Sequence, residues 1–211
     1  MNKSNVEPEF QGMYGKYKIT KADQIEVQRY RTAVLLCGIA FSAGIVHWLT
    51  LGPRFAWIWL ILIAIGLGLA LKWIHIYLRL LHQTLQILWG LGCVGLIILL
   101  IKFGGENLLS VIASDPIWTL AIGPLFAALT GLGFKEFFCF RRFEAIGLTA
   151  LIPLGILGHL TGLLNGKIVM GMLSCSAILL LILAIRKFGM DAADDIGDKS
   201  VFEYLDLQQA A

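Results

Sequence analysis

The histidines that stand in apolar surroundings are the residues of this chain best suited to chemistry. His159 lies in an apolar stretch over residues 145–166, and His47 lies in another over residues 32–53. An imidazole inside a membrane can ligate a haem iron or another metal, hold a pigment or relay protons, or it can form a hydrogen bond to a neighbouring helix. If the two stretches pack together, His47 and His159 lie at similar depth and form one cofactor-binding site.

A second candidate site is the segment 134–144, in which five phenylalanines are interspersed with five charges. We predict an interfacial loop in the head-group layer, with its rings toward the lipid and its charges toward water. Its charged residues either bind a lipid, an ion or a partner protein, or pair locally within a turn. They are Lys135, Glu136, Arg141, Arg142 and Glu144. The neighbouring Cys139 is interpreted as apolar filler rather than as a reactive thiol or metal ligand.

Other catalytic patterns are not found in the sequence. There is no phosphate-binding glycine loop, no paired-histidine zinc helix and no nucleophile elbow. Cys37, Cys93 and Cys175 have no metal-binding spacing. His75 and His82 are seven residues apart and are interpreted as interfacial polar residues. No zinc spacing or aromatic-basic pattern indicates nucleic-acid binding. We therefore expect a protein without catalytic turnover.

Composition identifies the elements that position these residues. Of the 211 residues, 58% are hydrophobic and 15% are charged, and the mean hydropathy is +0.79, which excludes a soluble domain. A transmembrane helix needs about 20 apolar residues to cross the hydrocarbon core. Six uncharged stretches meet this need, and we predict an all-α bundle of six transmembrane helices. They cover residues 32–53, 55–71, 80–101, 116–134, 145–166 and 168–185.

The basic residues predict the orientation of these spans. With the N-terminus inside, 14 Lys and Arg lie on the inner side and 3 on the outer side, which favours both termini inside. Each basic residue at that rim attracts anionic lipid head groups by about 1 kcal/mol. The first 31 residues are polar and contain no apolar core, so we expect no cleavable signal peptide.

Charge also divides the chain into three parts. We predict an N-terminal tail over residues 1–31, a membrane bundle over 32–187 and an acidic tail over 188–211. The acidic tail is expected to remain solvated, with docking onto a basic partner as the alternative. Within the bundle, Pro153 should kink the fifth span, and its glycines should let a neighbouring helix approach closely.

Several separated motifs resemble a known family. They are Gln11-Gly12, Tyr14-Gly15, Ile19-Thr20, Asp23, Glu26-Val27, Tyr30-Arg31, Phe134-Lys135-Glu136, Cys139-Phe140, Glu144, Ile152-Pro153 and Leu157-Gly158-His159-Leu160. The chain resembles a family of uncharacterised integral membrane proteins, a domain of unknown function found in cyanobacteria and plastids. The resemblance implies a thylakoid or cyanobacterial plasma-membrane address and supplies no reaction.

Together these features favour an accessory or assembly protein that associates with a larger, photosynthetic membrane complex. Chlorophyll or carotenoid is the candidate ligand at His159, and membrane lipids are expected partners. One alternative is a small ion or metal transporter that uses His47, His159 and the segment 136–144 as its pathway. Another is a haem-binding electron carrier. An inverted repeat would favour transport, but the first three spans show no convincing match to the last three.

Overall fold

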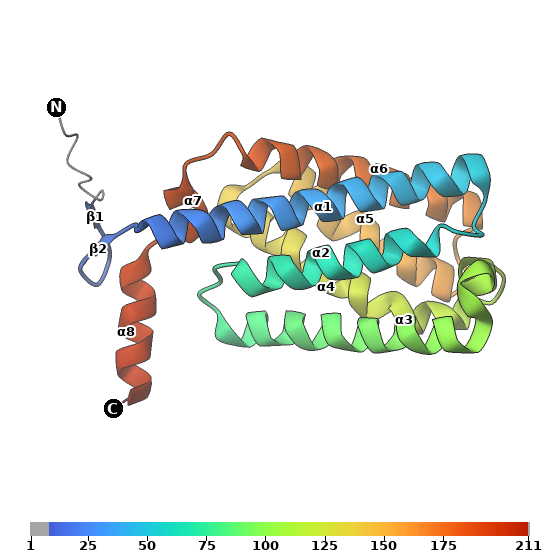
Figure 1. Cartoon of the computed structure of the whole chain (residues 1–211), viewed down its shortest axis with the longest axis horizontal. Helices are drawn as coiled ribbons and strands as arrows, with labels where there is room; N and C mark the ends of the chain where they lie inside the picture. The colour runs from blue at the N-terminus through green and yellow to red at the C-terminus, as the bar shows by residue number, and fades with distance from the viewer. Residues whose placement is uncertain (1–8, 211) are drawn as a thin grey trace.

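A bundle of long helices forms the body of the protein. The structure is a computed structural model that describes residues 9–210. Figure 1 shows the bundle helices lying alongside one another, with both described ends of the chain at one end of the bundle. We call this end the proximal end and the opposite one the distal end. The bundle helices are α1 (Lys21–Leu51), α2 (Trp57–Trp73), α3 (Arg79–Ser114), α4 (Thr119–Phe140), α5 (Phe143–Leu160) and α6 (Gly166–Lys187), and the short 3-10 turn η1 (Pro116–Trp118) precedes α4.

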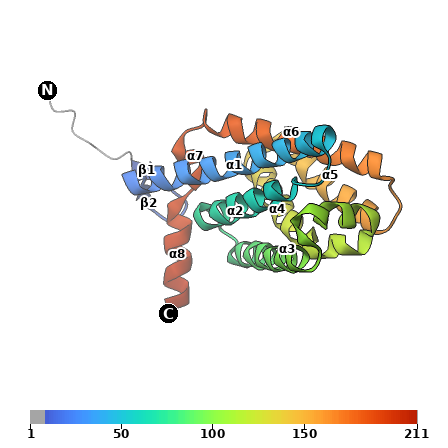
Figure 2. The ribbon, with the colours of Figure 1, turned by 45° about the vertical axis from the view of Figure 1, so that its right-hand side comes forward.

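The smaller elements gather at the proximal end. Strands β1 (Glu9–Gln11) and β2 (Lys16–Lys18) pair antiparallel with Phe10 opposite Tyr17. After α6 come the short helices α7 (Ala192–Ile196) and α8 (Lys199–Ala210). Figure 2 shows α8 extending away from the bundle rather than along it.

Each predicted span overlaps one bundle helix. Within the part of the chain that the structure describes, five helical segments are long and apolar enough to cross a membrane, and α2 is a shorter apolar helix of 17 residues. Many of their large apolar side chains are exposed, as with Ile101 on α3 and Leu154 on α5. Exposed apolar side chains are stable against lipid tails and unfavourable in water, so this exposure fits an integral membrane protein.

Several predicted boundaries need correction: α3 continues past residue 101 to Ser114, and α5 ends at Leu160 rather than at residue 166. Helix α1 begins at Lys21 rather than at residue 32, because Thr20 and Asp23 form a reciprocal capping box that starts it earlier. Helix α4 continues to Phe140, so most of the segment predicted as an interfacial loop is helical. Only Arg141 and Arg142 connect α4 to α5, and Arg141 turns the chain with a left-handed φ of 50°.

Glycines set the spacing between several helices. A Cβ on Gly95 would lie 1.9 Å from the carbonyl oxygen of Ala121, and one on Gly92 would lie 2.4 Å from the amide nitrogen of Leu125. Both contacts are shorter than any side chain allows, so α3 and α4 pack backbone to backbone. Gly66 of α2 approaches Cys37 of α1 in the same manner. The expected close packing at small residues is thus present, and it joins helices of this chain to one another.

Helix α3 is interrupted near the distal end. Gly104 has φ 71° and ψ 158°, a conformation that separates two helical stretches. Beyond it, Leu108, Leu109 and Ile112 are buried in the core of the bundle.

The acidic tail docks onto the chain instead of remaining solvated. Ile196 of α7 packs with Ile19 and Val27 in a small core at the proximal end. The ammonium of Lys199 lies 2.8 Å from Asp23 on α1. The rings of Tyr14 and Tyr204 stack with centroids 4.0 Å apart. The expectation of a solvated tail is therefore wrong for α7, because Asp195 and Ile196 are buried there, whereas α8 extends away from the bundle.

Asp198 joins the N-terminal hairpin to α8. Its carboxylate accepts hydrogen bonds from the Met13 amide at 2.6 Å and from the Ser200 hydroxyl at 2.6 Å. Desolvation alone raises the pKa of this carboxyl, but the hydrogen bonds from Ser200 and Met13 outweigh it and hold the pKa below its ordinary value. Folding therefore favours the charged form of Asp198.

Acidification should release the hairpin from α8. A carboxyl with a lowered pKa stabilises the fold fully above its unfolded value near 3.8 and loses that contribution as the pH falls through the folded value. We expect proteolysis between β1 and β2 to accelerate below about pH 4. An acid-active protease below pH 5 and a neutral-active protease at pH 7, each calibrated on an unfolded substrate at the same pH, would measure this. Asp198→Asn should show the rapid cleavage even at pH 7, and a variant that is cleaved like the wild type would contradict the assignment.

Candidate functional site

A cluster of buried charges lies inside the proximal end. Lys187, the last residue of α6, is fully buried, and its ammonium lies 2.7 Å from Glu136 of α4. The same ammonium pairs with Asp195 of α7. Removing these ions from water costs several kcal/mol each, and the attraction between closely paired ions is of the same order. Lys187 therefore fastens α4, α6 and α7 to one another.

Further residues complete this cluster. Arg31 of α1 lies 2.7 Å from Asp195 and donates to the backbone carbonyls of Met190 and Asp191. Tyr30 donates its hydroxyl to Glu136 at 2.6 Å, and Lys135 lies 3.3 Å from the same carboxylate. We call these residues the ion network; they are Tyr30, Arg31, Lys135, Glu136, Lys187 and Asp195.

The ion network holds three cations and two carboxylates, so it carries one excess positive charge. Aromatic faces offset this excess. The ammonium of Lys187 lies 5.0 Å from the ring centroid of Tyr30 and 4.9 Å from that of Phe140, and Lys135 is placed similarly over both rings. Such contacts contribute about 0.5–2 kcal/mol each, with the larger values where water is excluded.

A smaller ionic contact joins the last two bundle helices. Glu144 at the start of α5 is buried and lies 2.8 Å from Arg186 of α6 and 3.7 Å from Arg142. Of the five charged residues expected to meet a lipid or partner, Lys135, Glu136 and Glu144 are therefore buried among internal ionic partners, and Arg142 is half-buried. Arg141 stays exposed. Local pairing, the alternative interpretation, fits these charges better.

An apolar cavity of about 340 Å³ lies in the distal half of the bundle. All six bundle helices contribute to its lining, and nearly all the lining side chains are apolar. They include Phe41, Leu60, Ile112, Phe126, Ile156 and Val169. Ligand pockets in proteins span about 300–1,000 Å³ and combine an apolar lining with a few polar groups.

Two polar side chains line this cavity. His159 of α5 reaches across to α3, where its Nε2 lies 2.9 Å from the carbonyl oxygen of Ile112. Because a carbonyl only accepts, Nε2 carries the proton and Nδ1 is the accepting nitrogen. Thr119 at the start of α4 is 2% exposed, and its hydroxyl has no hydrogen-bond partner among the described residues. A buried hydroxyl without a partner destabilises the fold by about 1–3 kcal/mol.

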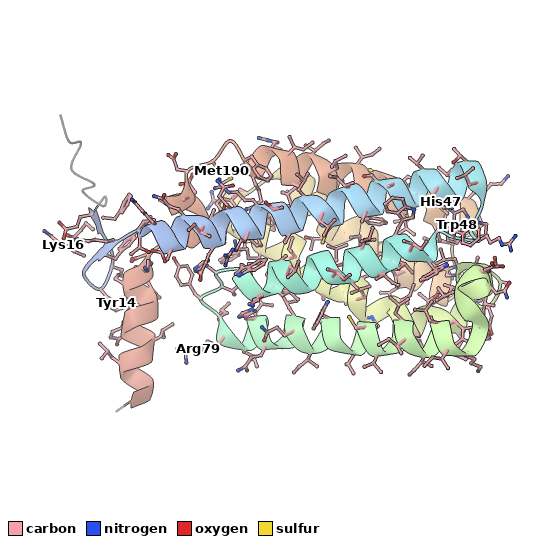
Figure 3. The ribbon with its side chains drawn as sticks, viewed as in Figure 1. Tyr14, Lys16, His47, Trp48, Arg79 and Met190 are labelled. Carbon is pink, nitrogen blue, oxygen red and sulfur yellow. The ribbon has the colours of Figure 1, made fainter. Side chains whose placement is uncertain are left out.

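His47 and His159 have separate hydrogen-bond partners. His47 accepts a hydrogen bond at Nδ1 from the indole of Trp59 at 3.1 Å, and it is not among the residues that line the cavity. Figure 3 shows His47 near Trp48 at the distal end of α1. Each imidazole is thus held by its own partner on another helix. The site ligated by both residues stays a prediction.

The remaining histidines and cysteines show no metal site. His82 lies 2.7 Å from the carbonyl of Leu71, while His75, in the connection after α2, lies 3.8 Å from Glu26. Burial lowers the pKa of His75, although the nearby Glu26 carboxylate partly opposes it. No group of three or more His, Cys, Asp or Glu side chains suited to a metal occurs among the residues that the structure describes.

A groove between α4 and α5 lies next to the cavity. It encloses about 390 Å³, and its walls include Pro124 and Pro153. Thr119, Phe126 and Ile156 line both the groove and the cavity. Leu120 and Leu157 in the groove are more than half exposed, on a surface that a membrane would cover. The groove, on the lipid-facing surface, and the cavity thus adjoin each other at these three shared side chains.

Removing the central cation should weaken the whole proximal end. Lys187→Met leaves Glu136 and Asp195 buried with one partner fewer, and loss of a buried ionic partner costs about 3–5 kcal/mol. We expect a clearly lower Tm of the detergent-solubilised chain. Lys167→Met, at an exposed position on the same helix, is the matched control and should leave Tm unchanged. Equal Tm values for the two variants would refute the structural role of the network.

Comparison with known proteins places the chain in a family. A family model described as "Uncharacterized integral membrane protein (DUF2301)" matches residues 69–204, which include Glu136, His159, Lys187 and Asp195. A Haemophilus influenzae protein, described as an uncharacterized protein, is 40% identical over 86 residues, or 40% of this chain and 49% of the relative. The chain thus spans about half the length of this curated relative, and the likeness extends beyond cyanobacteria and plastids.

No solved structure matches the chain. The family match runs from the last turn of α2 into α8 and covers more than half of the residues. The chain therefore belongs to the DUF2301 family of integral membrane proteins.

Proposed function

We propose that this chain is a membrane accessory protein that holds a small apolar, membrane-soluble molecule in its distal cavity. It acts by binding rather than by turnover. The observation that carries this proposal is the unpaired hydroxyl of Thr119 in the wall of an otherwise apolar cavity. A ligand with one hydrogen-bond acceptor and an apolar body would satisfy that hydroxyl and fill the space.

The groove between α4 and α5 supports entry from the membrane. A molecule dissolved in lipid would meet this groove first and would reach the cavity past Thr119, Phe126 and Ile156. Pro124 and Pro153 each remove a backbone hydrogen bond from their helices, which lets the groove walls move more readily than an unbroken helix. Direct exchange with the bilayer needs no aqueous path.

The chemistry of the lining separates this proposal from its alternatives. An ion pathway needs several polar groups, and the cavity lining offers Thr119 and His159. Axial ligation of a haem or chlorophyll through Nε2 of His159 would require that nitrogen to leave the Ile112 carbonyl and lose its proton. A small apolar ligand that accepts a hydrogen bond fits without this change, whereas an intact carotenoid exceeds the cavity's volume of about 340 Å³.

The topology and address complete the proposal. Helix α2 serves as a sixth span. Lys72 lies in its last turn, and its long side chain can place the ammonium among the head groups while its backbone lies within the hydrocarbon layer. The excess of basic residues at the proximal end favours both termini on the cytoplasmic or stromal side. A thylakoid or cyanobacterial plasma membrane, and a larger photosynthetic complex as partner, rest on the family resemblance stated above.

Purification in mild detergent tests both binding proposals. We expect organic extracts of the full chain to contain a stoichiometric apolar molecule, identified by mass spectrometry and absorption spectroscopy. Val169→Phe places a ring in the cavity and should abolish its retention, whereas Val46→Phe, on an exposed face of α1, should not. Absence of any retained molecule from all three proteins would refute ligand binding. A tagged chain that isolates alone would refute the complex.

Thr119→Val separates a binding role from a structural one. The substitution removes an unsatisfied hydroxyl while keeping the shape, so the ligand-free protein should unfold at an equal or higher temperature. Loss of one hydrogen bond to the ligand should weaken its retention by about three- to tenfold. Unfolding temperature and ligand content measured on the same samples check both effects. Unchanged retention would show that the hydroxyl does not contact the ligand.

A further inference from the structure

A second groove lies between α1 and α2, in the proximal half of the bundle. It encloses about 850 Å³ and shares no lining residue with the distal cavity. Close packing of Gly66 against Cys37 brings the two helices together deeper in the bundle. Toward the proximal end the groove is bounded by the first turns of α1 and by Trp73 at the end of α2.

The lining of this groove changes from charged to apolar along α1. Lys21, Gln24, Gln28 and Arg29 line the proximal part, and their spacing places them on one helical face. Deeper in the groove the lining consists of small and aliphatic side chains, to which Leu36 and Leu69 belong. The groove thus has a polar mouth and an apolar floor, as a single amphiphilic molecule would require.

Two cations at the mouth have no ionic partner within residues 9–210. Arg29 and Lys21 are exposed, and neither forms a salt bridge with any described residue. This contrasts with the ion network, where Arg31, Lys135 and Lys187 are each paired with a carboxylate. The Arg29 guanidinium instead lies over the ring of Trp73, 5.6 Å from its centroid, on the wall of the groove.

The geometry points to a binding site for one anionic phospholipid in this groove. The phosphate pairs with Arg29, the Lys21 ammonium two turns away on α1 adds positive charge at the mouth, the amides of Gln24 and Gln28 meet the polar head group, and an acyl chain follows Leu36 and Leu69. A phosphate oxygen supplies the charge that the two cations lack, and Arg binds phosphate through parallel hydrogen bonds. A tryptophan at the boundary is typical of the membrane interface.

Charge complementarity favours this occupant over a partner helix. A helix seated here would bury Lys21, Arg29 and two glutamines, whose donors would then need matching acceptors at every position. A lipid leaves the charged mouth hydrated and buries only the floor. The site is independent of the distal cavity, so it goes beyond the proposed function.

Lipid titration of the delipidated, full-length chain tests the site. Native mass spectrometry would compare phosphatidylglycerol with phosphatidylcholine of the same acyl chains. We expect the anionic lipid to be retained about fivefold more tightly. Arg29→Gln should reduce this preference to near unity, whereas Lys18→Gln removes an exposed charge at the same end, on β2, and should preserve it.

A second pair of variants tests the apolar floor. Leu69→Trp fills the floor and should reduce retention of the anionic lipid, while Ile58→Trp, at an exposed position of α2 outside the groove, should not. Equal retention of both lipids by the wild type, or equal behaviour of Arg29→Gln and Lys18→Gln, would overturn the proposal. So would displacement of phosphatidylglycerol by millimolar inorganic phosphate alone, because a free anion would then be the true ligand.

Discussion

The ammonium of Lys187, enclosed between two carboxylates, is the interaction on which the proximal half of the molecule depends. Its partners Glu136 and Asp195 come from α4 and α7, and Arg31 of α1 closes the group from the other side. None of these ions has water to solvate it, so each needs the others in place. The helices must therefore hold a single register at this end, and the tail must fold back to supply Asp195.

The two ends of the bundle differ in the interactions that they contain. At the proximal end, ionic and aromatic contacts join elements from all parts of the chain into a closed network. At the distal end, the same helices surround an apolar cavity in which Thr119 and His159 are the polar groups. A site for an exchangeable ligand is better placed away from interactions that hold the fold together, because binding and release then disturb little else.

Composition and charge were enough to predict the membrane class, the six helical regions and the close packing at glycines. They could not reveal which charges pair. Lys187 contributed to the sequence analysis only as a positive charge near a membrane end, Arg31 as such a charge and as part of a family motif, and Asp195 belonged to a tail expected to be solvated. The Arg31–Asp195 contact joins residues 164 positions apart, and no local pattern encodes such a pairing.

Depth along a helix was likewise a poor guide to contact. His47 and His159 were predicted at similar depth, yet the first faces Trp59 and the second faces the backbone of α3. Rotation of a helix about its axis decides such contacts, and it depends on neighbours that the sequence does not specify. Thr119 gave no signal at all, since a threonine at a helix start is ordinary until its surroundings are known.

Gly104, the glycine of α3 with a positive φ, brings the end of this helix to the wall of the distal cavity. At about 1.5 Å per residue, the 36 residues of α3 would extend well past the hydrocarbon layer if they continued straight. The bend at Gly104 instead directs the final turns inward, so that Leu109 and Ile112 line the distal cavity and the Ile112 carbonyl accepts the hydrogen bond from His159. One pair of backbone angles thus brings these residues to the cavity wall, and a side chain at position 104 would strain the bend.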